Sequence, residues 1–370
     1  MPWLAGVLLA AATSALPAHA QAWPPPFEWM NDPPARPALP ALSDTNSAAD
    51  YLSAGEYWLR YDDPKRAYAA GFWAARIDPA SARAFMLQWQ AAWQAAPGLR
   101  RRLDRNPKKT LEDADVRTSM LRLDSLYRRA LLRDPFELVD PSLRGNPAPT
   151  PPYVAELLRK HPNSIELRIH QAARHYRREQ YDSAVTYLQM AREILERRER
   201  DAARPSYVSK VMFHFAAAKA HEAVGDRNAA RAEYGAALAE ELGFAPAHAG
   251  LASIAWQNWS DPATARREYT LALELDSDPV VRFEFARMLR RYEEFEAAAL
   301  ELERVVYREP YYAAPYLLLG EVCERMGHAA RAASAYTKFV ARAPRSARAD
   351  VERAQARIAI LEQLLAPEPP

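Results

Sequence analysis

Small apolar residues recur every 34 positions in the C-terminal half of the chain. Three independent features share this spacing, namely Ala286 and Gly320, Ala298 and Ala332, and Pro310 and Pro344. Within each period, apolar positions at helical spacing predict two helices, with a short polar turn between them and a proline after the second. This regularity indicates a repeat protein, in which each unit packs mainly against its neighbours.

A second pattern pairs an alanine with a tyrosine four positions later. It occurs at Ala230 and Tyr234, Ala265 and Tyr269, and Ala332 and Tyr336. Residues four apart lie on one face of a helix, so the alanine admits a neighbouring helix closely and the tyrosine fills the gap beside it. We therefore expect these positions at the contacts between helices.

A two-helix unit of this length, with small contact residues and a terminal proline, resembles the tetratricopeptide repeat family. The resemblance implies an all-α, right-handed superhelical solenoid of six to seven stacked antiparallel helix pairs, which ends in a capping helix. Residues 346–370 fit the cap and a tail, because apolar and polar residues alternate at helical spacing over Ser346–Leu365. The best-known peptide clamp of the family is not matched, because the corresponding helix faces carry Ser53, His170, Ala216, Gly250, Glu284 and Leu318.

The pattern divides the remaining chain into two arrays. Residues 46–134 are predicted to form the N-terminal helices, and residues 153–345 the longer C-terminal array, with a proline-rich hinge at 135–152 between them. The insert at 97–115 opens basic and closes acidic, which favours a solvated loop that pairs with itself over a nucleic-acid patch. Gly71 stands where the family prefers an aromatic residue, and Phe72 and Trp73 are expected to supply that bulk.

The N-terminal residues have two distinct compositions. Residues 1–20 have a short apolar run followed by Ala18-His19-Ala20, which predicts a signal peptide cleaved after Ala20 and an exported, periplasmic protein. No lysine or arginine precedes the run, so an uncleaved anchor is the alternative. Residues 21–45 are predicted to be a proline-rich extended linker, whose aromatic residues dock on the first repeat or on a partner; these are Trp23, Phe27 and Trp29.

Charge and cysteine content narrow the possible partners. With 49 basic and 47 acidic residues the net charge is +2, so no whole-molecule field favours nucleic acid or an anionic membrane. No membrane span is expected in the mature chain. The single cysteine, Cys323, falls among apolar residues of a predicted helix, which favours a core position over a reactive thiol.

No catalytic or metal-binding pattern emerges. His170 and His175 point about 140° apart around one helix, and His214 and His221 are separated by about 10 Å along another. The sequence contains no glycine-rich phosphate loop, no G-x-S-x-G motif and no H-E-x-x-H motif. We therefore expect a protein that is not an enzyme and that holds no metal and no cofactor.

Candidate binding residues follow from the resemblance, which implies that the first helix of each pair lines a concave groove. Projection of that face gives Tyr176, Arg177, Phe215, Lys219, Trp256, Gln257, Phe283, Arg287, Arg290, Arg291 and Arg325, together with Glu222, Leu317 and Glu321. Arginine and aromatic side chains are enriched where proteins bind peptides. The alternative is that these arginines only solvate an exposed face.

Two functions fit this chain. The first is a non-catalytic scaffold or adaptor of a bacterial envelope assembly or secretion system, which binds acidic segments of partner proteins in the groove near Lys219, Arg287, Arg290 and Arg291. The second is a glycan-handling subunit of a polysaccharide export or synthesis system, since Trp256 and Trp259 offer stacking surfaces for sugars and arginines meet uronate carboxylates.

Overall fold

The structure, a computed structural model, describes residues 30, 33–136, 151–200 and 209–366. Over these residues it contains α-helices and short 3₁₀ turns and no strand, which confirms the all-α class. The expected signal peptide, Trp23, Phe27, Trp29 and most of the hinge at 135–152 lie outside the described residues. None of the helices in the described ranges is long and apolar enough to span a membrane.

The chain divides into two compact units. Of the described residues, the first unit takes those within Ala95–Phe244, and the second joins those of Pro33–Gln94 to those of Ala245–Pro370. Residues 153–345, expected as one array, are therefore shared between the units. The second unit is discontinuous because the first helix pair of the chain packs with the last repeats.

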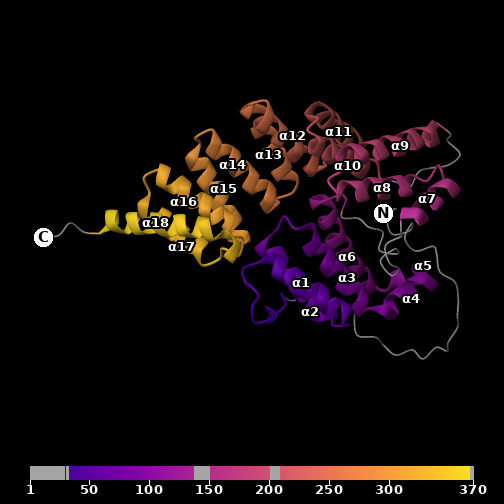
Figure 1. Ribbon diagram of the computed structural model, residues 1–370, viewed down its shortest axis with the longest axis horizontal. Helices are drawn as coiled ribbons and strands as arrows, with labels where there is room; N and C mark the ends of the chain where they lie inside the picture. Colours follow the sequence, from indigo (N-terminus) through magenta and orange to yellow (C-terminus); the bar gives the residue numbers. More distant parts are fainter. Residues whose placement is uncertain (1–29, 31–32, 137–150, 201–208, 367–370) are drawn as a thin grey trace. The chain divides into compact units, whose positions relative to one another are not determined.

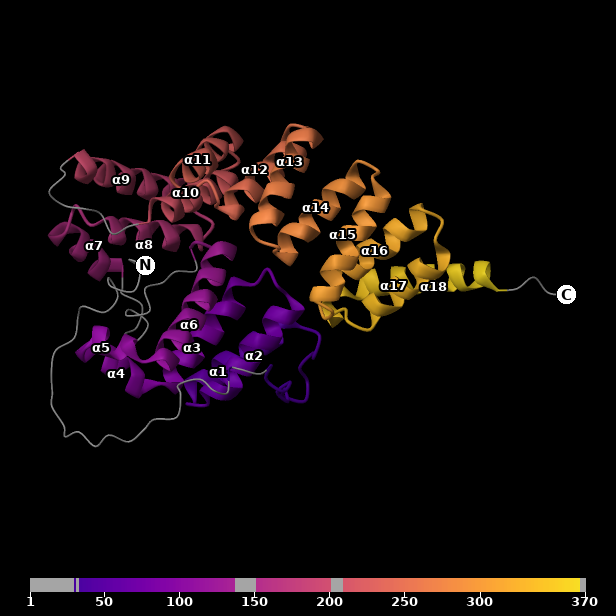
Figure 2. The ribbon, with the colours of Figure 1, turned by 180° about the vertical axis from the view of Figure 1, so that it is seen from behind.

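The first unit contains two regular helix pairs and several helices before them (Figures 1 and 2). Its helices are α4 (Pro97–Arg105), α5 (Pro107–Glu112), α6 (Ala114–Arg133), α7 (Pro151–Lys160), α8 (Ile165–Tyr176), α9 (Tyr181–Arg200), α10 (Lys210–Val224) and α11 (Arg227–Glu240). The pairs are α8–α9 and α10–α11, and α9 is 20 residues long.

The expectation of a loop at residues 97–115 is wrong, because α4 and α5 occupy most of it. Each helix has a proline at its start, and Asn106 caps α5 by accepting a hydrogen bond from the Lys109 amide. Leu99 and Leu103, four positions apart, are buried and give α4 one apolar face. Arg102 and Asp113 form an ion pair at 3.6 Å, so the segment does pair with itself.

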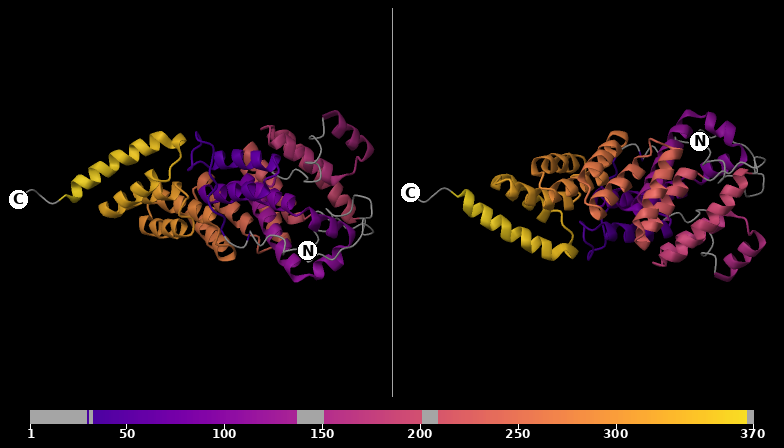
Figure 3. Two further views of the ribbon diagram at one scale, coloured as in Figure 1. Left: turned by 90° about the horizontal axis from the view of Figure 1, so that it is seen from below. Right: turned by 90° about the horizontal axis from the view of Figure 1, so that it is seen from above.

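The second unit carries the more regular pairs. Its helices are α1 (Ala48–Arg60), α2 (Pro64–Ile77), α3 (Ala82–Ala95), α12 (Ala245–Asn258), α13 (Pro262–Leu275), α14 (Pro279–Arg291), α15 (Phe295–Arg308), α16 (Ala314–Arg325), α17 (Ala329–Val340) and α18 (Arg348–Leu365). The pairs are α1–α2, α12–α13, α14–α15 and α16–α17. The predicted capping helix is confirmed as α18, the yellow helix at the C-terminal end in Figure 3. It packs against α17 and buries Ala354 and Leu361.

Helix starts are set by short polar residues followed by proline. Asp63 and Asp261 each accept a hydrogen bond from a backbone amide of the first turn, at 3.2 and 3.0 Å. Pro64 and Pro262 follow them at positions where a helix has no amide hydrogen bond to lose. These caps fix where α2 and α13 begin.

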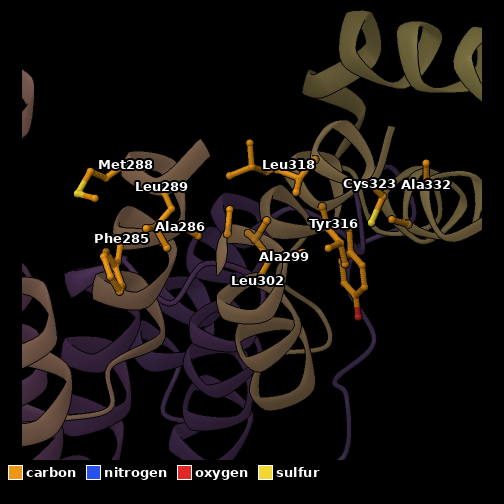
Figure 4. Close-up of a cluster of buried hydrophobic side chains, with 14 of the residues drawn as sticks. Phe285, Ala286, Met288, Leu289, Ala299, Leu302, Tyr316, Leu318, Cys323 and Ala332 are labelled. Carbon is orange, nitrogen blue, oxygen red and sulfur yellow. The ribbon is translucent and has the colours of Figure 1, made fainter. Parts of the chain in front are cut away.

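The predicted contact residues are buried. All six members of the alanine–tyrosine pairs are at most 2% exposed. Gly320 faces Tyr336 so closely that an added Cβ would lie 2.5 Å from the tyrosine ring, which explains the small residue at this position. Cys323 is 1% exposed within the same cluster, as expected, and burial raises the pKa of its thiol (Figure 4).

The explanation offered for Gly71 is wrong. A Cβ at Gly71 would lie 2.9 Å from the Ala84 carbonyl oxygen of α3, so the position needs glycine for close helix approach. Trp73 does not fill that space. Its indole instead packs edge-on against Tyr311, with ring centroids 5.0 Å apart.

A row of buried glutamates was not predicted. On second helices, Glu233, Glu268 and Glu301 are each at most 8% exposed, and each pairs with the first helix of its own pair through His214, His248 and Arg282 respectively. Those partners lie at 34-residue intervals. Burial opposes the ionisation of Glu233, but hydrogen bonds from His214 and Arg192 outweigh it and lower its pKa.

Candidate functional site

A groove of about 410 Å³ lies on the first helices of three successive pairs in the second unit. Its walls come from α12, α14 and α16, which follow one another along the unit (Figure 1). The lining residues are Trp256, Phe283, Arg287, Arg290, Arg291, Ala314, Leu317, Leu318 and Glu321. The first helices of these three pairs therefore contribute to one groove lining.

Helical spacing explains why these side chains meet. Phe283 and Arg287 lie four positions apart on α14, as do Leu317 and Glu321 on α16. On the same helix Phe285, Met288 and Leu289 are buried in the core (Figure 4). Arg287, Arg290 and Arg291 are exposed, and Phe283 lies between, partly buried against that core. The 34-residue period then aligns equivalent positions on neighbouring helices.

Two of the three groove arginines already have carboxylate partners. Arg287 donates to both carboxylate oxygens of Glu284 at 2.8 and 2.9 Å, and Arg290 pairs with Glu321 at 2.8 Å. Among the described residues, Arg291 has no ion-pair partner. Three guanidinium groups and two carboxylates leave one net positive charge, so the groove attracts anions modestly and Arg291 is the cation most available to a ligand.

The walls between the charges are aromatic and aliphatic. Trp256 donates from Nε1 to the Tyr269 hydroxyl at 3.0 Å, which fixes its indole. Burial raises the pKa of Tyr269, so this hydroxyl stays neutral. Phe283 packs edge-on against Tyr312 with ring centroids 5.4 Å apart. These contacts hold a rigid apolar surface beside the arginines.

The predicted residues of α8 and α10 lie in the first unit and have other contacts. Tyr176 stacks on Phe136 at 4.1 Å, and its burial with nearby Asp134 raises its pKa to about 12. Arg177 donates to the Phe136 carbonyl oxygen at 3.2 Å. These two residues cover Phe136 and form no part of the groove in the second unit.

The two candidates on α10, Phe215 and Lys219, also lie in the first unit and outside the groove lining. Phe215 is only 4% exposed and packs against Tyr234 and Phe244, so its prediction as a binding residue is wrong. Lys219 pairs with Glu222 at 2.5 Å and belongs to the first unit, so it is not shown to share a site with the groove arginines.

The remaining candidates of the second unit lie outside the groove lining. Gln257 is exposed beyond Trp256. Arg325 pairs with Glu293 at 3.7 Å and lies over the Phe295 ring at 5.1 Å. Trp259 is 41% exposed and does not line the groove. Of the residues projected onto the groove face, the structure brings together Trp256, Phe283, Arg287, Arg290, Arg291, Leu317 and Glu321.

Sequence reasoning missed two features of the site. Ala314 lines the groove from the first turn of α16, and nothing in its local pattern separates it from a packing alanine. The pairing of Glu284 with Arg287 was also missed, although their spacing of three positions on one helix is a known signal for an ion pair. That signal would have lowered the expected positive charge by one.

The histidines lie in structural contacts. His214 contacts Glu233 at 2.8 Å, and His248 contacts Glu268 at 2.7 Å. His175 contacts Gln180 at 2.8 Å. Within the described ranges there is no group of three or more His, Cys, Asp or Glu residues placed to hold a metal ion.

The architecture can now be identified. Helix pairs repeat every 34 residues with small residues at their contacts, and their first helices face a common groove. Over the described residues the chain is an all-α helical-repeat solenoid, and its 34-residue pattern resembles the tetratricopeptide repeat. No family model and no curated protein matches this chain.

Three of the solved structures similar to this chain are as follows. Yeast Tom70 is 12% identical over 85% of this chain and 90% of its own, with a TM-score of 0.46. YrrB, described as a TPR protein with an unusual peptide-binding site, is 14% identical over 55% of this chain and 97% of its own, with a TM-score of 0.41. MamA is 14% identical over 48% of this chain and 91% of its own, with a TM-score of 0.40. This degree of likeness concerns the helical-repeat fold and leaves the partner open.

Proposed function

We propose that this tetratricopeptide-repeat chain is a non-catalytic scaffold that binds a segment of a partner protein in the groove of α12, α14 and α16. The observation that carries the proposal is the groove itself, where fixed aromatic walls lie beside an arginine without an ion-pair partner among the described residues. Aromatic side chains and arginines contribute much of the binding energy in peptide and protein interfaces.

The partner segment combines one carboxylate with an apolar side chain. Arg291 is the cation left for that carboxylate, because Glu284 and Glu321 pair with Arg287 and Arg290. A charge-assisted contact contributes about 1.5 to 3 kcal/mol where water is excluded, and less at an open rim. Affinity should therefore fall only modestly as salt concentration rises, since one net charge is involved.

The setting that we propose is the bacterial envelope, in an assembly or secretion system. The support is the apolar run and the Ala18-His19-Ala20 pattern at the start of the chain. Mass analysis of the N-terminus of the protein from its native host tests this setting. A mature chain that begins at Gln21 supports export, whereas an intact Met1 in the cytosol contradicts it.

Site-specific photo-crosslinking tests the binding site directly. A photo-reactive amino acid at Leu317, in the groove wall, should give a discrete crosslink to one protein in native cells. The matched position is Glu296, which is exposed on the second helix α15. Equal crosslinking at both positions, or none at Leu317, would argue against groove binding.

A glycan-handling role is the second candidate, and the place of Trp256 in the groove favours it. An indole beside arginines suits a sugar ring with a uronate carboxylate. Trp259 does not line the groove, so any stacking there would rely on Trp256 alone. Saturable binding of an acidic polysaccharide, lost on Trp256→Ala, would favour this role over the protein scaffold.

A further inference from the structure

The segment that precedes α1 places an arginine among three aromatic rings. The Arg36 guanidinium carbon lies 5.5 Å from the centre of the Tyr51 ring, 5.1 Å from Trp73 and 5.9 Å from Tyr311. We call Tyr51, Trp73 and Tyr311 the aromatic cage. The rings come from α1, from α2 and from the loop before α16, so the cage joins the first helix pair to a late repeat of the same unit.

Directional hydrogen bonds fix the guanidinium in this cage. Arg36 donates from Nε to the Tyr51 hydroxyl at 2.7 Å and from Nη2 to the Thr45 carbonyl oxygen. Trp73 donates from Nε1 to the Pro34 carbonyl oxygen at 3.0 Å, which holds the backbone beside Arg36. Prolines at 33, 34, 37 and 40 favour an extended backbone, so little conformational entropy is lost when the segment docks.

A second set of contacts links the first helix pair, and the segment before it, to the late repeats. Asp44 accepts a hydrogen bond from the Arg345 amide at 2.6 Å, and Asn46 donates to the Ala341 carbonyl oxygen at 3.2 Å. Arg76 pairs with Glu309 at 3.2 Å. The first helix pair is thus attached to two loops between repeats, at residues 309–312 and 341–345.

The first of these loops also touches the groove. Tyr311 belongs to the cage, and the next residue, Tyr312, packs against the groove residue Phe283 with ring centroids 5.4 Å apart. Pro310 accepts hydrogen bonds from Tyr316 at 3.3 Å and from Arg342 at 2.5 Å. A short stiff loop therefore connects the cage to one wall of the groove.

We propose that Arg36 is a positioning residue for the groove: by filling the aromatic cage it holds loop 309–312, and through Tyr312 it sets the Phe283 wall for binding. This inference rests on the proposed function, because it concerns access to the same groove. Arg36 touches no ligand in this scheme. Its effect passes from the guanidinium to Tyr311, along the backbone to Tyr312, and from there to Phe283.

Hydrogen exchange measured by mass spectrometry tests the positioning without a ligand. In Arg36→Ala, amides of residues 309–316 and 279–291 should exchange at least fivefold faster than in the wild type. Arg36→Lys keeps the positive charge but loses the forked hydrogen bonds, so it should give an intermediate rate. The matched control is Arg83→Ala, which removes an exposed ion pair between α3 and Glu56 of α1. Circular dichroism confirms that each variant remains folded.

Binding of a fluorescein-labelled peptide of alternating glutamate and leucine supplies the second measurement. Arg36→Ala should bind this peptide at least fivefold more weakly than the wild type, with Arg83→Ala unchanged. Faster exchange with unchanged affinity would overturn the coupling to the groove and leave groove binding intact. If the wild type fails to bind, the proposed function fails for this peptide, and the exchange result alone decides the role of Arg36. Unchanged exchange in both segments overturns the inference in every case.

Discussion

Phe215 of the first unit and Phe283 of the second occupy the same position in their repeats, two 34-residue periods apart. Each packs edge-on against an aromatic residue that follows its helix pair, Phe244 at 5.5 Å and Tyr312 at 5.4 Å. Yet Phe215 is buried, whereas Phe283 forms a wall of the groove. One local difference is that Phe215 also packs against Tyr234, while the shorter Leu302 stands at the matching position of the other repeat.

The charged positions of the two regions differ as well. Lys219 corresponds to Arg287 and Glu222 corresponds to Arg290. In α10 the two residues pair with each other at 2.5 Å. In α14 both positions are arginines, which find their carboxylates elsewhere and leave Arg291 unpaired among the described residues. Residues that are a whole number of repeats apart therefore lie on the same face of their helices. Whether that face is free to bind a ligand depends on the residues that pack or pair with it locally.

The comparison predicts its largest difference in stability at the two phenylalanines. Phe215→Ala should destabilise the protein by about 3 to 5 kcal/mol, because it empties a buried site. Phe283→Ala should cost only about 1 to 2 kcal/mol, because its ring is partly exposed already. Urea denaturation of both variants checks this, and equal losses would remove the distinction between the two positions.

Substitution of Ala332 tests the assignment of the packing face on which this comparison of repeats depends. Ala332→Leu should overpack the contact between α16 and α17 and destabilise the protein by about 1 to 3 kcal/mol, since Ala332 is fully buried. Ala330→Leu on the same helix is the control, because Ala330 is exposed. Thermal melts that do not separate these variants would show that the packing face is misassigned.

In the last repeat, the stability that a carboxylate contributes at the position equivalent to Arg290 should depend on pH. Glu324 stands one period after Arg290 but is held by Arg357 of α18 and by the Tyr336 hydroxyl at 2.7 Å. Burial opposes its ionisation, and hydrogen bonds from Arg357 and Tyr336 outweigh that effect and lower its pKa. The resulting stability is present above the ordinary glutamate pKa of about 4.3 and is lost as pH falls through the lowered value.

Arg357→Ala tests this dependence. The variant should be less stable than the wild type by about 1 kcal/mol at pH 7, because Arg357 is half-exposed. The gap should shrink as pH falls below about 4. Urea midpoints over a pH series measure it. A gap that stays constant to low pH would mean that Glu324 does not gain its stability from ionisation.

The fold was largely predictable because its period is long and its contact residues are distinctive. Ala298, Ala332 and Gly320 are small for reasons of helix approach, and that requirement is visible in the sequence. The insert at 97–115 was harder, since its charges suggested a loop while two leucines and two prolines support short helices. The prediction of a loop gave more weight to the charged residues of the insert than to the helical spacing of its leucines.

The site was predictable only in part. Spacing places Phe283, Arg287 and Leu317 on groove faces, but it assigns Phe215 to the same face although neighbours from other helices bury it. Burial depends on residues distant in the sequence, such as Phe244. The docking of Arg36 on Tyr311 joins positions 275 residues apart, and no periodic pattern carries that information.

The central claim is that the groove of the second unit binds a partner segment and the equivalent face of the first unit does not. Fluorescence anisotropy with the glutamate–leucine peptide tests it most directly. The Arg287→Ala, Arg291→Ala double variant should bind at least tenfold more weakly than the wild type with unchanged helical content, and Lys219→Ala should bind like the wild type. Normal binding by the double variant, or an equal loss in Lys219→Ala, would contradict the account.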